Sequence, residues 1–148
     1  MCSSDLNEIG GEHVPWVDPY NFYDKFSEDL LDIGLIPLID PEINVFNRAK
    51  SNIKWLEYSH YSIPSVVSGC KPYVQHIKNG ETGIIANTEN DWFRSISNLI
   101  DDSLLRVKIG HSAKKEVDKN FTIQTHAMEW YNLYMDSLEG KVKYLSEK

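Results

Sequence analysis

Short apolar runs alternate with segments of helical periodicity along the first half of the chain. The runs IGLIPLI (33–39), IPSVVSG (63–69) and TGIIA (82–86) are almost entirely apolar, as expected of strands that are covered on both faces. EHVPWV (12–17) is a fourth strand candidate. Because helical segments separate successive strands, the pattern predicts an α/β fold: a three-layer, Rossmann-like parallel sheet of about four strands with a helical C-terminal segment.

The helices are expected between and after these strands. Apolar residues at helical spacing predict helices over 18–32 and 50–60. A loop is expected over 40–47, and a short helical turn over 71–80.

Beyond residue 87 the pattern predicts helices only. Thr88 and Asp91 have the spacing of a capping box, a second helix is expected over about 102–120, and a third opens at Thr122. The third helix carries apolar residues at steps of three and four, namely Ile123, Ala127, Trp130 or Tyr131, Tyr134 and Leu138.

Length and charge narrow the class of protein. The chain has 148 residues, enough for one domain with a real core, and a formal net charge of −7. This charge, without a long basic run, argues against a general nucleic-acid or anionic-membrane surface. Cys2 and Cys70 make neither a disulfide framework nor a metal-type spacing. No stretch approaches the roughly 20 apolar residues of a spanning helix, so we expect a cytoplasmic protein that reaches a membrane only through a partner.

Candidate binding chemistry lies where the helix predicted over 50–60 begins. In parallel sheets ligands sit beyond the carboxyl ends of the strands, where helix N-termini attract anions. On a helical wheel Lys50, Lys54 and Glu57 share one sector, and the first and last are roughly 10 Å apart along the axis. That length suits a diphosphate at the helix start and a ribose further on, whose vicinal hydroxyls a carboxylate binds well. The same spacing fits an ordinary surface ion pair between Lys54 and Glu57, and both interpretations stay open on spacing alone.

The order of these segments resembles a known family. DIGLIPL, then FNRAKSNIKWLEYSHYSIPSVVS with its K-x-x-E-Y helix, and then NGETGIIA are similar to the C-terminal, nucleotide-sugar-binding domain of retaining glycosyltransferases of the GT-B fold, family 4 or group 1. The resemblance covers roughly 13–138, which leaves 1–12 as an N-terminal extension and 139–148 as a polar tail. It implies a domain that holds a nucleotide diphosphate sugar, such as a UDP- or GDP-sugar, without a catalytic metal or other cofactor.

The resemblance implies roles for individual residues. Glu57 would bind the ribose hydroxyls and Lys54 a phosphate, while the backbone amides of Ser51, Asn52 and Ile53 would face the diphosphate.

Other positions match the family less well. Trp16 and Val17 lie where the main chain of family members borders the base. Ala49 stands where the family has the first Glu of an E-x7-E motif, so that role is empty or taken by a neighbour. The resemblance finds no counterpart for the first two βα units of the family domain or for the basic pair they carry, so catalytic residues stay unassigned.

Two functions follow as hypotheses. One is the donor-binding portion of a glycosyltransferase that transfers a sugar to a glycan or lipid-linked acceptor, and that is inactive without an N-terminal acceptor domain or partner chain. The other is a non-catalytic interaction module that keeps the fold. An exposed sheet edge at 12–17 and 33–36 also predicts a homodimer or a tight partner, unless residues 1–12 fold back over it.

Overall fold

The computed structural model describes residues 10–11, 18, 20–21, 31–39 and 45–139. The chain divides into two compact units, 1–30 and 31–148, and every helix and strand named below lies in the second. The strand predicted over 12–17 and most of the helix predicted over 18–32 lie outside the described residues.

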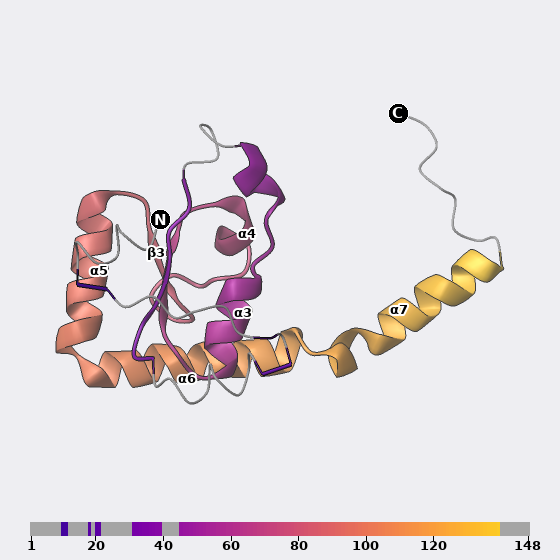
Figure 1. The fold of residues 1–148 in the computed structure, drawn as a ribbon. Coiled ribbons are helices and arrows are strands. Elements are labelled where there is room, and N and C mark those ends of the chain that lie inside the picture. The colour runs from indigo at the N-terminus through magenta and orange to yellow at the C-terminus, as the bar shows by residue number, and fades with distance from the viewer. Residues whose placement is uncertain (1–9, 12–17, 19, 22–30, 40–44, 140–148) are drawn as a thin grey trace. The chain divides into compact units, whose positions relative to one another are not determined.

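The parallel sheet has three strands within the described ranges (Figure 1). These strands are β1 (Gly34–Ile36), β2 (Ser65–Ser68) and β3 (Ile84–Ala86), in the spatial order β1-β2-β3. Leu35 pairs with Val66, and Val66 pairs with Ile84. Because all pairs are parallel, the carboxyl ends of the strands meet at one edge of the sheet. The predicted α/β class is confirmed.

β1 is shorter and less covered than its sequence predicts. Gly34 and Ile36 are buried, but Leu35 between them is 47% exposed. β1 is the outer strand of the described sheet, and the helix on the Leu35 face, α5 (Glu89–Asp101), packs over β2 and β3 instead. The expectation that both faces of this strand are covered is therefore wrong at Leu35. The homodimer expected through this edge stays a prediction.

The remaining helices join and flank the strands. They are η1 (Val45–Ala49), α3 (Ile53–His60), α4 (Lys71–Val74), α6 (Ser103–Asn120) and α7 (Ile123–Leu138). The capping box of α5 is confirmed, because Thr88 Oγ1 accepts from Asp91 N at 3.1 Å and the Asp91 carboxylate accepts from Thr88 N at 3.0 Å. Asp102 and Thr122 cap α6 and α7 by accepting from a main-chain amide three residues on.

The helix predicted over 50–60 begins later than expected. The 3-10 helix η1 occupies 45–49, and α-helical hydrogen bonding starts at Asn52, whose carbonyl accepts from the amides three and four residues on. Ser51 and Asn52 favour cap positions over helix interiors, which explains the later start. Lys50 thus lies outside the helix. The expectation that Lys50 shares a helical face with Lys54 and Glu57 is wrong.

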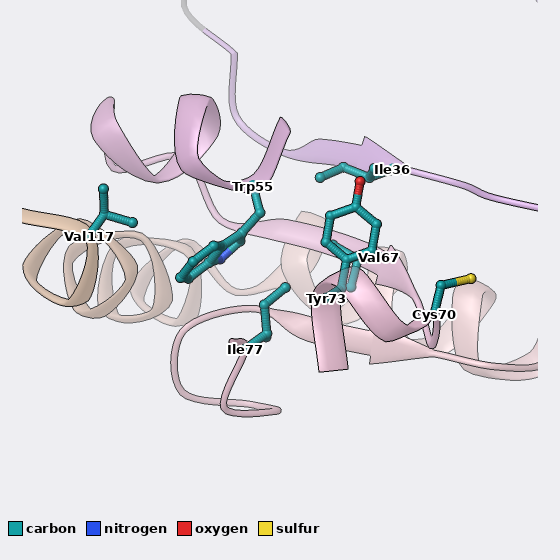
Figure 2. Packing of buried hydrophobic residues seen from close by; sticks show 7 residues of the cluster. All are labelled: Ile36, Trp55, Val67, Cys70, Tyr73, Ile77 and Val117. Atoms are coloured by element: carbon teal, nitrogen blue, oxygen red, sulfur yellow. The ribbon is translucent and has the colours of Figure 1, made fainter. Parts of the chain in front are cut away.

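Apolar clusters fill both faces of the sheet. The cluster beside α3 consists of Ile36, Trp55, Val67, Cys70, Tyr73, Ile77 and Val117 (Figure 2). The cluster on the opposite face consists of Val66, Ala86, Leu99 and Ile109. Neighbouring residues of β2 thus point to opposite faces, as the pleat requires, and helices cover each face.

α6 lies against the turn that joins α3 to β2. A Cβ atom at Gly110 would overlap the carbonyl oxygen of Ser62, so only glycine allows this approach. Lys114 Nζ also donates to the carbonyl oxygen of His60, the last residue of α3, at 2.9 Å. α6 is therefore fixed at the amino end of β2, opposite to the carboxyl edge of the sheet.

α7 forms at the predicted place, but none of its residues is buried. Ile123 is 84% exposed, Tyr134 67% and Leu138 82%. At its start His126 Nε2 lies 2.8 Å from the carbonyl oxygen of Asn120. Within the described ranges no helix is both long and apolar enough to cross a membrane.

Gly110→Ala is expected to lower the free energy of unfolding by up to about 2 kcal/mol, because overpacking costs about 1–3 kcal/mol and the gain in helix propensity offsets roughly 1 kcal/mol of it. Denaturation by guanidinium chloride measures the change. Ser112→Ala, in the same helix, is the control and should leave stability unchanged or slightly raised. A stability of Gly110→Ala equal to that of the unmodified chain would show that α6 can move away from Ser62 without cost.

Candidate functional site

A cleft of about 630 Å³ opens at the carboxyl end of β1. Its walls come from the end of β1, from the start of α3 and from α4. The residues that line it are Leu35, Ile36, Pro37, Leu38, Lys50, Ser51, Ile53, Lys54, Tyr58 and Tyr73. The cleft therefore occupies the sheet edge at which parallel α/β folds bind ligands.

Two buried side chains hold the segment that follows β1. Ser68 Oγ, at the end of β2, accepts from Leu38 N at 2.8 Å and donates to Leu38 O at 3.1 Å. Asn47 Nδ2, in η1, donates to the carbonyl oxygen of Ile39 at 2.6 Å. The wall formed by the residues after β1 is thus tied both to the sheet and to the segment that leads into α3.

The N-terminus of α3 faces this cleft without a side-chain cap and without an acidic residue in its first turn. α5, α6 and α7 each have a side-chain cap. The first amides of α3 and its dipole therefore keep their capacity to attract an anion. Lys50 and Lys54, on either side of Ser51 and Ile53 in the sequence, also line the cleft and add positive charge there.

Lys54 and Glu57 form the ion pair that their spacing allows. Lys54 Nζ donates to Glu57 Oε2 at 3.0 Å, and the two side chains are 56% and 14% exposed. Lys54 lines the cleft, whereas Glu57 is not among its lining residues. Lys50 Nζ lies instead over the ring of Phe46, 5.7 Å from its centre. The three predicted side chains thus do not form one row.

The other predicted residues divide between the cleft and its surroundings. Ser51 and Ile53 line the cleft. Asn52 does not, and its Nδ2 is buried without a hydrogen-bond partner among the described residues. Trp16 and Val17 lie outside the described part of the chain. Within that part, no three His, Cys, Asp or Glu side chains gather closely enough to hold a metal ion.

Two tyrosines that were not among the predicted site residues also line the cleft. The ring of Tyr58 covers Gly34, where a Cβ atom would come within 2.7 Å of the ring. Burial raises the pKa of Tyr58, and Lys54 opposes this shift. Burial likewise raises the pKa of Tyr73, so both phenols stay protonated at neutral pH. The signal for Tyr58 was the Tyr of K-x-x-E-Y, whereas no local pattern marked Tyr73, which lies in α4.

Comparison with known proteins gives one curated relative and a shared fold. No family model matches the chain. It is 31% identical over 93 residues to the capsular polysaccharide biosynthesis glycosyltransferase CapM of Staphylococcus aureus, a match that covers 58% of this chain and 24% of that protein. The chain thus spans about a quarter of the length of this relative.

Two solved structures share the fold at low sequence identity. The C-terminal domain of the glycosyl transferase group 1 family protein LpcC from Francisella tularensis is 16% identical, with a TM-score of 0.62 over 82% of this chain and 61% of that one. Sucrose-phosphate synthase from Thermosynechococcus elongatus is 14% identical, with a TM-score of 0.74 over 93% of this chain and 34% of that one. The chain has the fold of a glycosyltransferase group 1 C-terminal domain, as the resemblance implies.

Glu57→Gln is expected to change the free energy of unfolding by no more than about 0.5 kcal/mol, because an i,i+3 pair with an exposed partner contributes little. Glu116→Gln is the comparison and should destabilise more. Glu116 accepts from Lys78 Nζ and from Asn120 Nδ2, both at 2.9 Å, and chiefly the Lys78 hydrogen bond lowers its pKa.

The pH dependence of stability checks this assignment. A carboxyl group whose pKa is lowered by folding stabilises the protein above its unfolded pKa, and this contribution is lost as the pH falls through the folded pKa. The stability difference between the unmodified chain and Glu116→Gln should therefore shrink in acid. A large loss of stability in Glu57→Gln at neutral pH would instead make Glu57 a structural residue.

Proposed function

We propose that this chain, which shares the fold of glycosyltransferase group 1 C-terminal domains, is the donor-binding part of a glycosyltransferase. The observation that carries the proposal is the cleft, where Lys50, Ser51 and Lys54 surround the uncapped start of α3 at the carboxyl edge of a parallel sheet. The name of the S. aureus relative, which refers to capsular polysaccharide biosynthesis, supports a glycan acceptor, and a lipid-linked acceptor is the alternative.

The diphosphate of a UDP- or GDP-sugar binds at the start of α3 in this proposal. The main-chain amides of Ser51, Asn52 and Ile53 donate to phosphate oxygens, and Lys50 and Lys54 balance the negative charge. The N-terminus of α3 and the two lysines together supply the positive charge, so in this proposal binding requires no metal or other cofactor.

Glu57 binds the ribose of the donor. In the structure its carboxylate accepts from Lys54, so the two groups have to separate before a ribose can take that place. A diphosphate in the cleft attracts the Lys54 ammonium group, and the Glu57 carboxylate then accepts from two vicinal hydroxyls. Trp16 and Val17 border the base in the same arrangement.

Transfer of the sugar needs more than this chain. Holding donor and acceptor in one cleft supplies roughly 7–11 kcal/mol of a barrier, and the proposed site holds the donor only. The acceptor domain belongs to the same polypeptide or to a partner chain. A cytoplasmic location is part of the proposal.

A non-catalytic interaction module is the second candidate. The observation that favours it is α7, whose apolar side chains are exposed along its whole length. Exposed apolar area of this kind marks contact with another protein segment. Since a donor domain can also use such a contact, nucleotide binding is the property that separates the two functions.

Calorimetric titration with UDP, GDP, uridine and guanosine tests the diphosphate site. At least one diphosphate should bind, and more tightly than its nucleoside. Lys54→Gln should weaken that binding by about 1.5–3 kcal/mol, the scale of a hydrogen bond to a charged group. Arg94→Gln, an exposed change of equal charge on α5, is the matched control and should bind normally. Equal affinities for nucleoside and diphosphate, or no binding at all, would support the interaction module.

The role of Glu57 is tested with a nucleotide that lacks one ribose hydroxyl. Glu57→Gln should weaken binding of the preferred diphosphate by about 1.5–3 kcal/mol and weaken its 2′-deoxy analogue clearly less. The difference between the two losses isolates the contact with the hydroxyl. Equal losses for both nucleotides would mean that Glu57 acts through Lys54 and not through the ribose.

A further inference from the structure

The outward side of α6 gathers lysines that are dispersed in the sequence. Within a sector of about 140° on the helical wheel lie the residues that we call the lysine face, namely Lys108, His111, Lys114, Lys115, Asp118 and Lys119. Four lysines against one aspartate give this face a net charge of +3 with His111 neutral, so the rest of the chain carries −10. The face is thus positive on a strongly acidic chain.

The acidic residues of α6 do not neutralise this face. Glu116 lies on another side of the helix, where it accepts from Lys78 and Asn120. Asp118 lies 3.4 Å from Lys114 Nζ, which also donates to a main-chain carbonyl. Lys108 and Lys115 are exposed and form no ion pair with any residue of the described ranges.

An apolar edge continues the lysine face where α5 meets α6. Ile100 is 62% exposed, Leu104 79% and Val107 53%. Leu104 lies one turn before Lys108 and Val107 one turn before His111, on the same side of the helix. Farther along the face, a hollow of about 720 Å³ is lined by Ser62 and by five of the six lysine-face residues, all but Lys108. The surface therefore combines cations, a hollow and exposed aliphatic groups.

We propose that the lysine face docks on an anionic lipid surface, with headgroup phosphates at the lysines and the apolar edge in the interfacial layer. A basic helix side with exposed aliphatic residues is the pattern of interfacial membrane binding. Lysine ammonium groups on flexible stems suit mobile headgroups better than the fixed geometry of a protein carboxylate. The cations of the lysine face run from Lys108 to Lys119 along α6, so they follow a straight line of roughly 16 Å that fits a flat surface.

The acidity of the whole chain does not prevent this docking. At physiological ionic strength charges are screened beyond about 8 Å, so the membrane responds to the nearest face and not to the total charge. The net charge of the chain argues against a general anionic-membrane surface. In this proposal the lysine face is one local surface that binds such a membrane nonetheless. Because α6 passes the amino end of β2, the docked face lies at the sheet edge opposite to the cleft, and the cleft stays open.

Cosedimentation with vesicles tests the docking. The full chain should sediment with vesicles of equal parts phosphatidylglycerol and phosphatidylcholine and stay in solution with pure phosphatidylcholine. The double change Lys108→Gln and Lys115→Gln should weaken binding about 25-fold, since each lysine near an anionic surface contributes about 5-fold. Leu104→Ser should weaken it as well. Lys71→Gln with Arg94→Gln removes the same charge elsewhere and is the matched control, expected to bind as the unmodified chain does.

Several outcomes would overturn the proposal. The chain could stay in solution with both kinds of vesicle, or it could sediment equally with both. The lysine-face variant and the control variant could also lose binding equally. Release by inorganic phosphate beyond that by sodium chloride of the same ionic strength would assign the face to a discrete phosphate site instead. Nucleotide binding by the same variants should be unchanged, so a failure of the donor-site proposal and a failure of this one are distinguishable.

Discussion

Burial of Trp55 is the interaction on which the positions of the other elements depend. The side chain is fully buried on the inner side of α3, and its indole N–H donates to the carbonyl oxygen of Thr82 at 2.9 Å, just before β3. Phe121, at the end of α6, meets the indole edge-on at 5.6 Å between ring centres. One residue therefore joins α3, the entry to β3 and the end of α6. An aromatic ring of this size stabilises a core strongly because its single polar group is also satisfied.

The geometry of the cleft follows from this packing. α3 has eight residues, too few to be stable alone, so its orientation comes from the side chains that it buries. With Trp55 turned inward, Ile53 and Lys54 are left at the cleft, and Tyr58 covers Gly34 of β1. The other end of the helix is held by Lys114 from α6. The uncapped N-terminus thus lies at the carboxyl edge of the sheet as a consequence of the core, before any ligand contributes.

The sequence predicts the elements of this fold better than the details of the site. Apolar runs locate the three strands because burial selects apolar residues, and side-chain caps locate the starts of α5, α6 and α7. The 3-10 helix η1 was not predictable from spacing, since a separate turn and a continuous helix place apolar residues similarly, and Lys50 was therefore placed on the wrong face. Leu35 was expected to be buried because an apolar run does not show whether its strand lies at an edge. Tyr73 enters the cleft through a contact distant in sequence, which no local pattern encodes.

The distribution of charge shows most clearly what folding adds to composition. Along α6 the lysines at 108, 114, 115 and 119 alternate with Glu116 and Asp118, so the segment looks mixed in sequence. The fold sends Glu116 to Lys78, 38 residues away in the chain, and leaves the lysines outward. Lys50 and Lys54 are gathered in a similar way at the start of α3 by the turn that precedes it. An acidic chain thereby presents positive charge at two opposite edges of its sheet, and each edge can attract a different anion because screening separates them.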